Sequence, residues 1–132
     1  MKKKKAYIFI IISVIITCAP FINQAIHIDD THFIYTAKQI NKDFFHPYSF
    51  VLNWRGVNEY AYPIVTNPPL IPYFLSLIIF LFGNSEVTLH IFFIPFSILA
   101  SFSMYFLAKR FTKNPAFCAI LFLTSPAFMV MS

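Results

Sequence analysis

The chain begins MKKKKAYIFIIISVIITCAPFINQAIHIDD (residues 1–30), and this stretch determines the class of fold. Four lysines precede an uncharged apolar run, Ala6–Ile26, whose 21 residues would form a helix of roughly 31 Å. That length matches the roughly 30 Å hydrocarbon core of a bilayer. A basic block ahead of a first span is typical of a cytoplasmic N-terminus. Because the run is longer than the roughly 7–15 residues of a signal-peptide core, we expect an uncleaved span.

The composition of the whole chain also indicates a membrane protein. Hydrophobic residues make up 58% of the sequence and charged residues 11%, whereas about 25% are charged in ordinary soluble domains. The net charge of +5 owes most to the four N-terminal lysines, so it does not indicate a nucleic-acid partner. Cys18 and Cys118 fall inside apolar segments without a neighbouring cysteine, so neither a disulfide nor a zinc site is predicted.

Four apolar segments predict the architecture. They cover about residues 6–26, 69–82, 89–108 and 116–131. We expect an all-α polytopic integral membrane protein, in which residues 1–132 form one transmembrane domain with four hydrophobic helices and an external loop at 27–67. Pro95 interrupts the third segment and Pro126 the fourth, and neighbouring helices must compensate for the lost hydrogen bonds. Gly83 is well placed to end the second helix.

The loop at 27–67 is the longest polar stretch and holds four of the five acidic residues and three of the four histidines. Its part Thr31–Ile40 is amphipathic at helical spacing, with one apolar face formed by Phe33, Ile34, Ala37 and Ile40. We interpret this part as a short helix on the membrane surface, with Asp30 as its N-cap. After this part, His46-Pro47-Tyr48 and Asn53-Trp54-Arg55-Gly56 are predicted to form a loop with turns.

The predicted topology contains a conflict. If the N-terminal lysines are cytoplasmic, four full spans place Lys109, Arg110 and Lys113 on the outer face, against the positive-inside tendency. A re-entrant second segment would remove the conflict, because its 14 residues are marginal for spanning. A family resemblance nevertheless favours a full span.

This resemblance rests on four motifs in a fixed order, which are Asp29-Asp30, Asn67-Pro68-Pro69-Leu70, Phe82-Gly83-Asn84-Ser85 and Ala108-Lys109-Arg110. Their order resembles the start of the GT-C superfamily of membrane glycosyltransferases, in particular bacterial relatives of protein O-mannosyltransferases and of the aminoarabinose transferase. The similarity covers about residues 8–128. Two positions depart from the pattern: Asn67 stands where His or Lys is commoner, and His90 where Arg is frequent.

The resemblance implies an enzyme of the plasma or inner membrane. Such enzymes move a hexose or pentose from a polyprenyl-phosphate donor in the lipid to an acceptor hydroxyl at the external face. Asp29 would be the general base that takes the proton of this hydroxyl. Asp30 would orient the acceptor or hold a divalent cation. Arg55 and Asn67 are the substrate-binding candidates, because basic and amide groups stabilise the charge of the departing phosphate.

Other interpretations of these residues stay open. The two aspartates could be a helix cap and a solvated charge, or could join His27 and His32 in a metal cluster, although a His-x4-His spacing does not align both rings on one helical face. No resident metal is predicted. Trp54 and the nearby tyrosines could form an interfacial aromatic belt or a platform on which a sugar stacks.

Two other functional classes also fit an apolar chain of this length. One is a small non-enzymatic membrane subunit, and the other is a transporter or flippase fragment. Transport is disfavoured because segments 6–26 and 89–108 contain no ionisable residue except His90 at an edge. Since the sequence stops within an apolar stretch and the resembled family continues for several spans, we expect an N-terminal portion of a larger transferase that is inactive alone.

Overall fold

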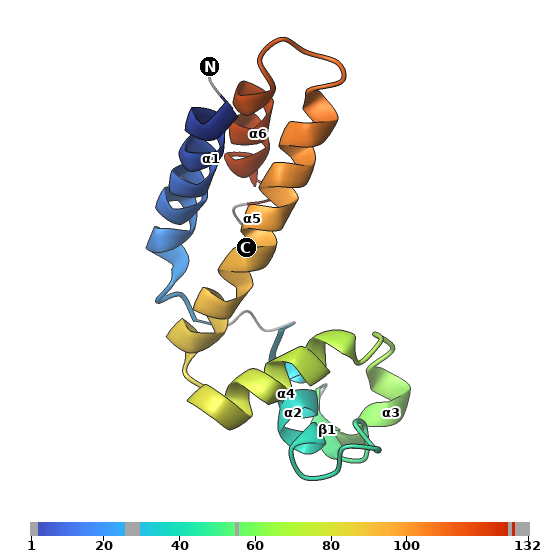
Figure 1. The fold of residues 1–132 in the computed structure, drawn as a ribbon. Coiled ribbons are helices and arrows are strands. Elements are labelled where there is room, and N and C mark those ends of the chain that lie inside the picture. Colours follow the sequence, from blue (N-terminus) through green and yellow to red (C-terminus); the bar gives the residue numbers. More distant parts are fainter. Residues whose placement is uncertain (1–2, 26–29, 55, 127, 129–132) are drawn as a thin grey trace. The chain divides into compact units, whose positions relative to one another are not determined.

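The computed structural model describes residues 3–25, 30–54, 56–126 and 128. This part of the chain is mostly helical and divides into two compact units (Figure 1). The first unit comprises residues Met1–Gln24 and His90–Ser132, and the second comprises Ala25–Leu89. Each unit has a hydrophobic core of its own.

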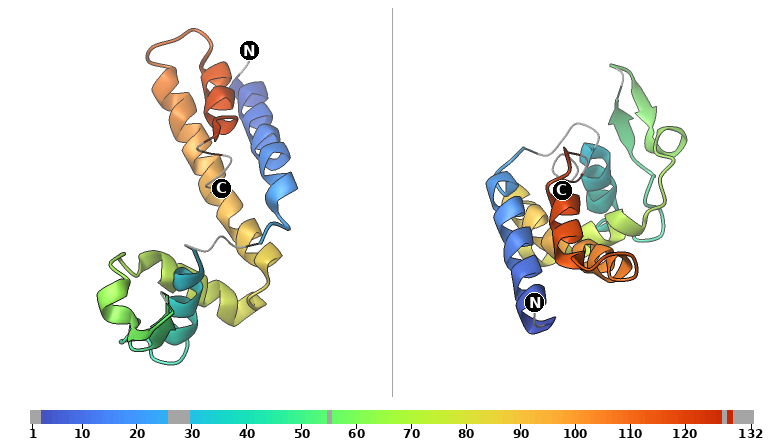
Figure 2. Two further views of the ribbon diagram at one scale, coloured as in Figure 1. Left: turned by 180° about the vertical axis from the view of Figure 1, so that it is seen from behind. Right: turned by 90° about the horizontal axis from the view of Figure 1, so that it is seen from above.

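The first unit is a bundle of apolar helices. α1 covers Lys3–Cys18 and is followed by the 3-10 turn η1 at Ala19–Phe21; α5 covers Glu86–Ala108, and α6 covers Pro115–Leu123. In Figures 1 and 2 the three α-helices lie side by side. Buried side chains join them in two clusters, one of Ala6, Ile10, Tyr105 and Ala119, the other of Val14, Cys18 and Leu123.

Helix α1 runs antiparallel to α5. Near the start of α1, Tyr7 packs edge-on against Phe102 and Tyr105 near the end of α5, with ring centroids 5.6 and 5.8 Å apart. Beyond the other end of α1, the carbonyl oxygen of Gln24 lies 3.1 Å from His90 Nε2. The lysines at the start of α1 and the basic residues that follow α5 therefore lie at the same end of this unit.

Two helical segments of the described residues are long and apolar enough to cross a membrane. They are Lys4–Phe21 and Glu86–Ala108. Only 22% of the first and 17% of the second is buried within the protein, whereas the core helix of a soluble protein would be mostly buried. Large apolar side chains such as Ile16 and Leu99 are exposed, as suits a helix surrounded by lipid. The predicted helical membrane protein is supported at this level, and the four spans remain a prediction.

Prolines set the helix ends in the first unit. α1 stops at Cys18, short of the predicted Ile26, because Ala19 precedes Pro20 and the residue before proline disfavours the α conformation. α6 ends at Leu123, where Ser125 likewise precedes Pro126. The last five residues of the fourth predicted segment fall largely outside the described part of the chain. α5, in contrast, continues through Pro95.

The second unit contains two helices packed together and a small hairpin. The amphipathic helix α2 covers Thr31–Ile40, which confirms the predicted bounds. It packs against α4, Leu70–Phe82, and buries Thr36, Ala37 and Ile40. Of the predicted apolar face, Ala37 and Ile40 are therefore packed within the protein, whereas Phe33 and Ile34 are half-buried.

The predicted turn at His46-Pro47-Tyr48 is present, and a hairpin that the sequence did not predict lies between the two helices. β1, Val51–Asn53, pairs antiparallel with β2, Asn58–Tyr60, and the short helix α3 follows at Ala61–Ile64. Figure 2 shows the two strands as adjacent arrows. Leu52, Ala61 and Val65 form the small core of this region, against which Trp54 packs. Three-residue strands are too short to display the alternation by which strands are recognised in a sequence.

Helix α4 is shorter than a membrane span. Its 13 residues extend about 20 Å, against a hydrocarbon core of about 30 Å. Gly83 ends it with φ 83° and ψ 177°, a backbone region that essentially only glycine adopts, which confirms its predicted role. Leu70 and Phe80 are among its most exposed side chains, at 78% and 75%.

Candidate functional site

The start of α2 presents one of the two candidate catalytic carboxylates. Asp30 occupies the N-cap position with φ −87° and ψ −14°, but its side chain makes no cap hydrogen bond. The expectation that Asp30 caps this helix is correct for its position and wrong for the hydrogen bond. The residue is exposed, so the carboxylate at this helix end is accessible from solvent.

The start of α2 lies beside the Asn67-Pro68-Pro69-Leu70 motif. The side-chain amide nitrogen of Asn67 is 3.3 Å from His32 Nε2, and which group donates depends on the tautomer of the ring. The Tyr48 hydroxyl donates a hydrogen bond to the carbonyl oxygen of Asn67. Asn67 is thus held from two sides, and it is brought close to the second residue after Asp30.

Helix packing maintains this juxtaposition. The Ser76 hydroxyl donates to Asn41 Oδ1 at 2.7 Å, and Asn41 Nδ2 donates to the Ser76 carbonyl oxygen at 3.3 Å. Asn41 and Ser76 are 35 residues apart, as are His32 and Asn67, so α2 and α4 run in the same direction with a constant offset. The buried Thr36 hydroxyl donates to the His32 carbonyl oxygen at 2.8 Å, within the same turn of α2.

The aromatic ring of Trp54 also contacts His32. The Trp54 ring meets the His32 ring edge-on, with centroids 6.0 Å apart. Trp54 is half-buried and rests on the hairpin core. His32 therefore contacts both the proline motif and the hairpin.

Two ionisable side chains near the site have shifted pKa values. The hydrogen bond from His46 Nδ1, 2.8 Å from Asp43 Oδ2, lowers the pKa of Asp43, which keeps this carboxylate ionised. Burial, and to a smaller extent the neighbouring Tyr73 hydroxyl, raises the pKa of Tyr48. The Tyr48 hydroxyl therefore remains protonated and able to donate to Asn67 across the neutral range.

Two of the four predicted site residues cannot be placed in this geometry. Asp29 and Arg55 lie outside the described residues. Asp30 and Asn67 both belong to the second unit. Asp30 lies at the start of α2 and Asn67 shortly before α4, and the contact of His32 with Asn67 joins these two segments. Within the part of the chain that the structure describes, no group of three metal-ligating side chains comes together.

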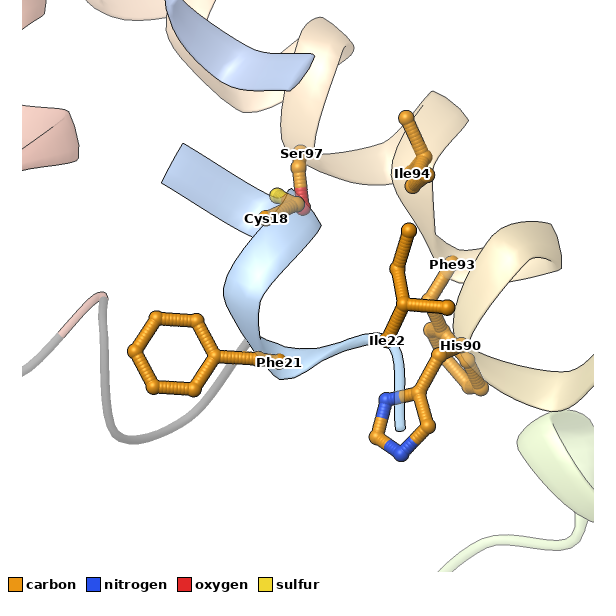
Figure 3. Close-up of a pocket in the computed structure, with 7 residues that line it drawn as sticks. All are labelled: Cys18, Phe21, Ile22, His90, Phe93, Ile94 and Ser97. Carbon is orange, nitrogen blue, oxygen red and sulfur yellow. The ribbon is translucent and has the colours of Figure 1, made fainter. Parts of the chain in front are cut away.

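A hollow in the helical bundle is too small for a substrate. It measures about 10 Å³, roughly the space that one water needs, and is lined by Cys18, Phe21, Ile22, His90, Phe93, Ile94 and Ser97. Figure 3 shows Cys18 and Ser97 directed toward each other at one end of this hollow, with the His90 ring at the other. It is a packing gap between the helices of this unit.

His32 is the residue whose contacts the sequence did not indicate. The sequence places His32 in the predicted helix Thr31–Ile40 and suggests either a histidine without a special role or a metal ligand. The structure shows that, from the first turn of α2, its ring contacts Asn67 and Trp54. Asn67 is 35 positions away in the sequence, and nothing in the local pattern announces that offset. The sequence signal that could have drawn attention to His32 is its place at the start of a predicted helix, directly after the Asp29-Asp30 pair.

Comparison with known proteins identifies a family that the chain matches. The family described as dolichyl-phosphate-mannose-protein mannosyltransferase matches residues 66–132, which is just over half of the chain. The match includes Asn67, α4, α5 and α6, and it begins after Asp29, Asp30 and Arg55. No curated protein matches the chain, and no solved structure matches it.

Proposed function

The chain belongs to the dolichyl-phosphate-mannose-protein mannosyltransferase family, and on this premise we propose that it serves in sugar transfer from a polyprenyl-phosphate donor to an acceptor hydroxyl at the external membrane face. Family membership makes it a membrane glycosyltransferase of the mannosyltransferase type. What we propose beyond family membership is the kind of donor, the kind of acceptor and the side of the membrane on which transfer takes place.

The reaction needs a base at the acceptor and stabilisation of the leaving phosphate. A hydroxyl is a weak nucleophile until a positioned base takes its proton as it attacks the anomeric carbon. The bond from that carbon to the carrier phosphate breaks, and the phosphate leaves with the bonding electrons. We assign the base to Asp29. Asp30 either orients the acceptor or holds a divalent cation that the phosphate would also contact.

The contact between His32 and Asn67 is the observation that supports this proposal most. It brings the exposed Asp30 at the start of α2 near the proline motif that opens α4. A base and an amide donor on separate segments must converge if they are to act on the two sides of one reacting carbon. Asn67 would donate its amide to the carrier phosphate, and Arg55 would neutralise the phosphate charge.

Sugar transfer is the direct test of this function. The full-length protein that carries this chain should be reconstituted in liposomes and given polyprenyl-phosphate mannose labelled in the sugar, with a cell-envelope extract as the source of acceptor. We expect label to pass to the acceptor and polyprenyl phosphate to be released. A donor carrying a pentose tests the alternative sugar. Equal label in liposomes that lack the protein, with either donor, would refute the proposed function.

The two candidate spans support a topology with both basic ends in the cytoplasm. Lys4 and Lys5 at the start of α1 lie at the same end of the first unit as Lys109 and Arg110 after α5. If α1 and α5 cross the membrane and the short α4 does not, both groups are cytoplasmic and residues 27–89 are external. This arrangement satisfies the positive-inside tendency. It differs from the expected full span at 69–82.

Cysteine labelling distinguishes the two topologies. In a background with Cys18→Ala and Cys118→Ala, an impermeant maleimide applied to intact cells should label Asn53→Cys. It should label Lys113→Cys only after permeabilisation. If α4 crosses the membrane, Lys113→Cys becomes reactive from outside while Asn53→Cys is unchanged. Labelling of Asn53→Cys from the cytoplasmic side alone would overturn both arrangements.

A further inference from the structure

The hairpin of the second unit forms one side of an open hollow. Its volume is about 250 Å³, and its lining residues are Trp54, Val57, Glu59, Pro63 and Ile64. That volume is many times the roughly 10–15 Å³ that a single water needs. The hollow can therefore hold a ligand with several polar groups.

The pairing of the two strands shows how Glu59 and Trp54 come to border this hollow. Glu59 lies opposite Leu52 across the hairpin, and directly opposed residues project from the same face of a sheet. Leu52 is buried in the hairpin core, whereas Glu59 is exposed. Trp54, two residues after Leu52, packs on this core and also lines the hollow. An indole ring and a carboxylate thus border the same space.

This pairing of side chains suits one class of ligand. An ionised carboxylate accepts hydrogen bonds at two oxygens and donates none, so it fits a ligand that carries adjacent hydroxyls. An indole ring offers a broad apolar surface to a ligand with a C–H face. The negative charge of Glu59 opposes a phosphate in direct contact with it.

We propose that the hollow bordered by Trp54 and Glu59 binds a pyranose ring, with the C–H face of the sugar on the indole and neighbouring hydroxyls donating to Glu59. The inference rests on the proposed function, because sugars are then the substrates that this unit meets. Trp54 contacts His32 edge-on, and His32 in turn contacts Asn67. The hollow therefore lies on the hairpin side of the His32–Asn67 contact.

Trp54 supplies a readout that does not depend on turnover, because it is the single tryptophan of the chain. Purified protein in detergent should be titrated with methyl α-mannoside while the emission of Trp54 is recorded. We expect a saturable change of intensity or wavelength. A second titration with mannose 1-phosphate tests whether the bound pyranose belongs to the donor or to the acceptor. Binding at least as tight as that of methyl α-mannoside indicates the donor sugar. Weaker binding indicates a sugar of the acceptor.

A substitution at Glu59 tests the assigned contact. Glu59→Gln keeps the size of the side chain and removes its charge, so the affinity for methyl α-mannoside should fall about tenfold or more. Glu86→Gln is the matched control, since this glutamate is exposed and does not line the hollow. It should leave the affinity unchanged. Saturation-transfer NMR of the sugar extends the test to Trp54→Ala, which should abolish the signal while circular dichroism shows the helices intact.

The outcomes separate this inference from the proposed function. Absence of any saturable change with either sugar, or equal effects of Glu59→Gln and Glu86→Gln, would overturn the inference even if the protein transfers sugar. Sugar binding that requires Glu59, in a protein that transfers no sugar from any polyprenyl-phosphate donor, would refute the proposed reaction and support the binding site.

Discussion

Replacing Asp29 by asparagine in the full-length protein is expected to lower the rate of sugar transfer by about 10²–10⁴-fold, the usual contribution of a general base. Asparagine keeps the size of the side chain but cannot take the proton of the acceptor hydroxyl at neutral pH. Donor binding should therefore change little, and the loss should appear in the turnover rate. Initial rates with labelled polyprenyl-phosphate mannose, measured over a range of donor concentrations in liposomes, separate the two effects.

Two comparisons make this result specific. Asp43→Asn removes a carboxylate of the same unit whose hydrogen-bond partner is His46, and it should retain most of the activity. Asp30→Asn should reduce the rate less than Asp29→Asn. If a divalent cation is bound at Asp30, its substitution and treatment with a chelator should cause similar losses. Transfer at the wild-type rate by the Asp29→Asn protein would show that the base has been assigned wrongly.

Truncation of Ile40 is expected to give a large loss of stability in the second unit. Ile40 is 3% exposed at the end of α2, which packs on α4. Removing buried methyl and methylene groups leaves a cavity, and Ile→Ala changes in such positions cost about 2–5 kcal/mol. Unfolding by urea in detergent, followed through the emission of Trp54, reports this unit because the tryptophan lies within it.

Tyr35→Ala on the same helix is the matched control for Ile40→Ala. Tyr35 is 52% exposed, so its truncation should cost less than about 1 kcal/mol. The rate of sugar transfer should fall with Ile40→Ala at temperatures where the unit unfolds, because the start of α2 then loses its contact with Asn67. Equal urea midpoints for the two variants would contradict the packing of α2 on α4 through Ile40.

The sequence determined those features that depend on local periodicity and on backbone chemistry. The apolar face of α2 recurs every three to four residues, so its bounds, Thr31 and Ile40, could be predicted. Gly83 could be identified as the end of α4, since a glycine adopts backbone angles that other residues do not. The long uncharged runs that became α1 and α5 indicated a membrane protein, because lipid accepts such exposed surfaces.

The hairpin and the junction at Asn67 were decided only by the tertiary structure. Each strand is three residues long and is stabilised by its partner strand, a contact that no local pattern encodes. The junction depends on the offset of 35 residues at which α2 packs on α4. Side-chain packing and the Asn41–Ser76 hydrogen bonds set that offset, so the sequence could name Asp30 and Asn67 as candidates but could not show that His32 would bring their segments together.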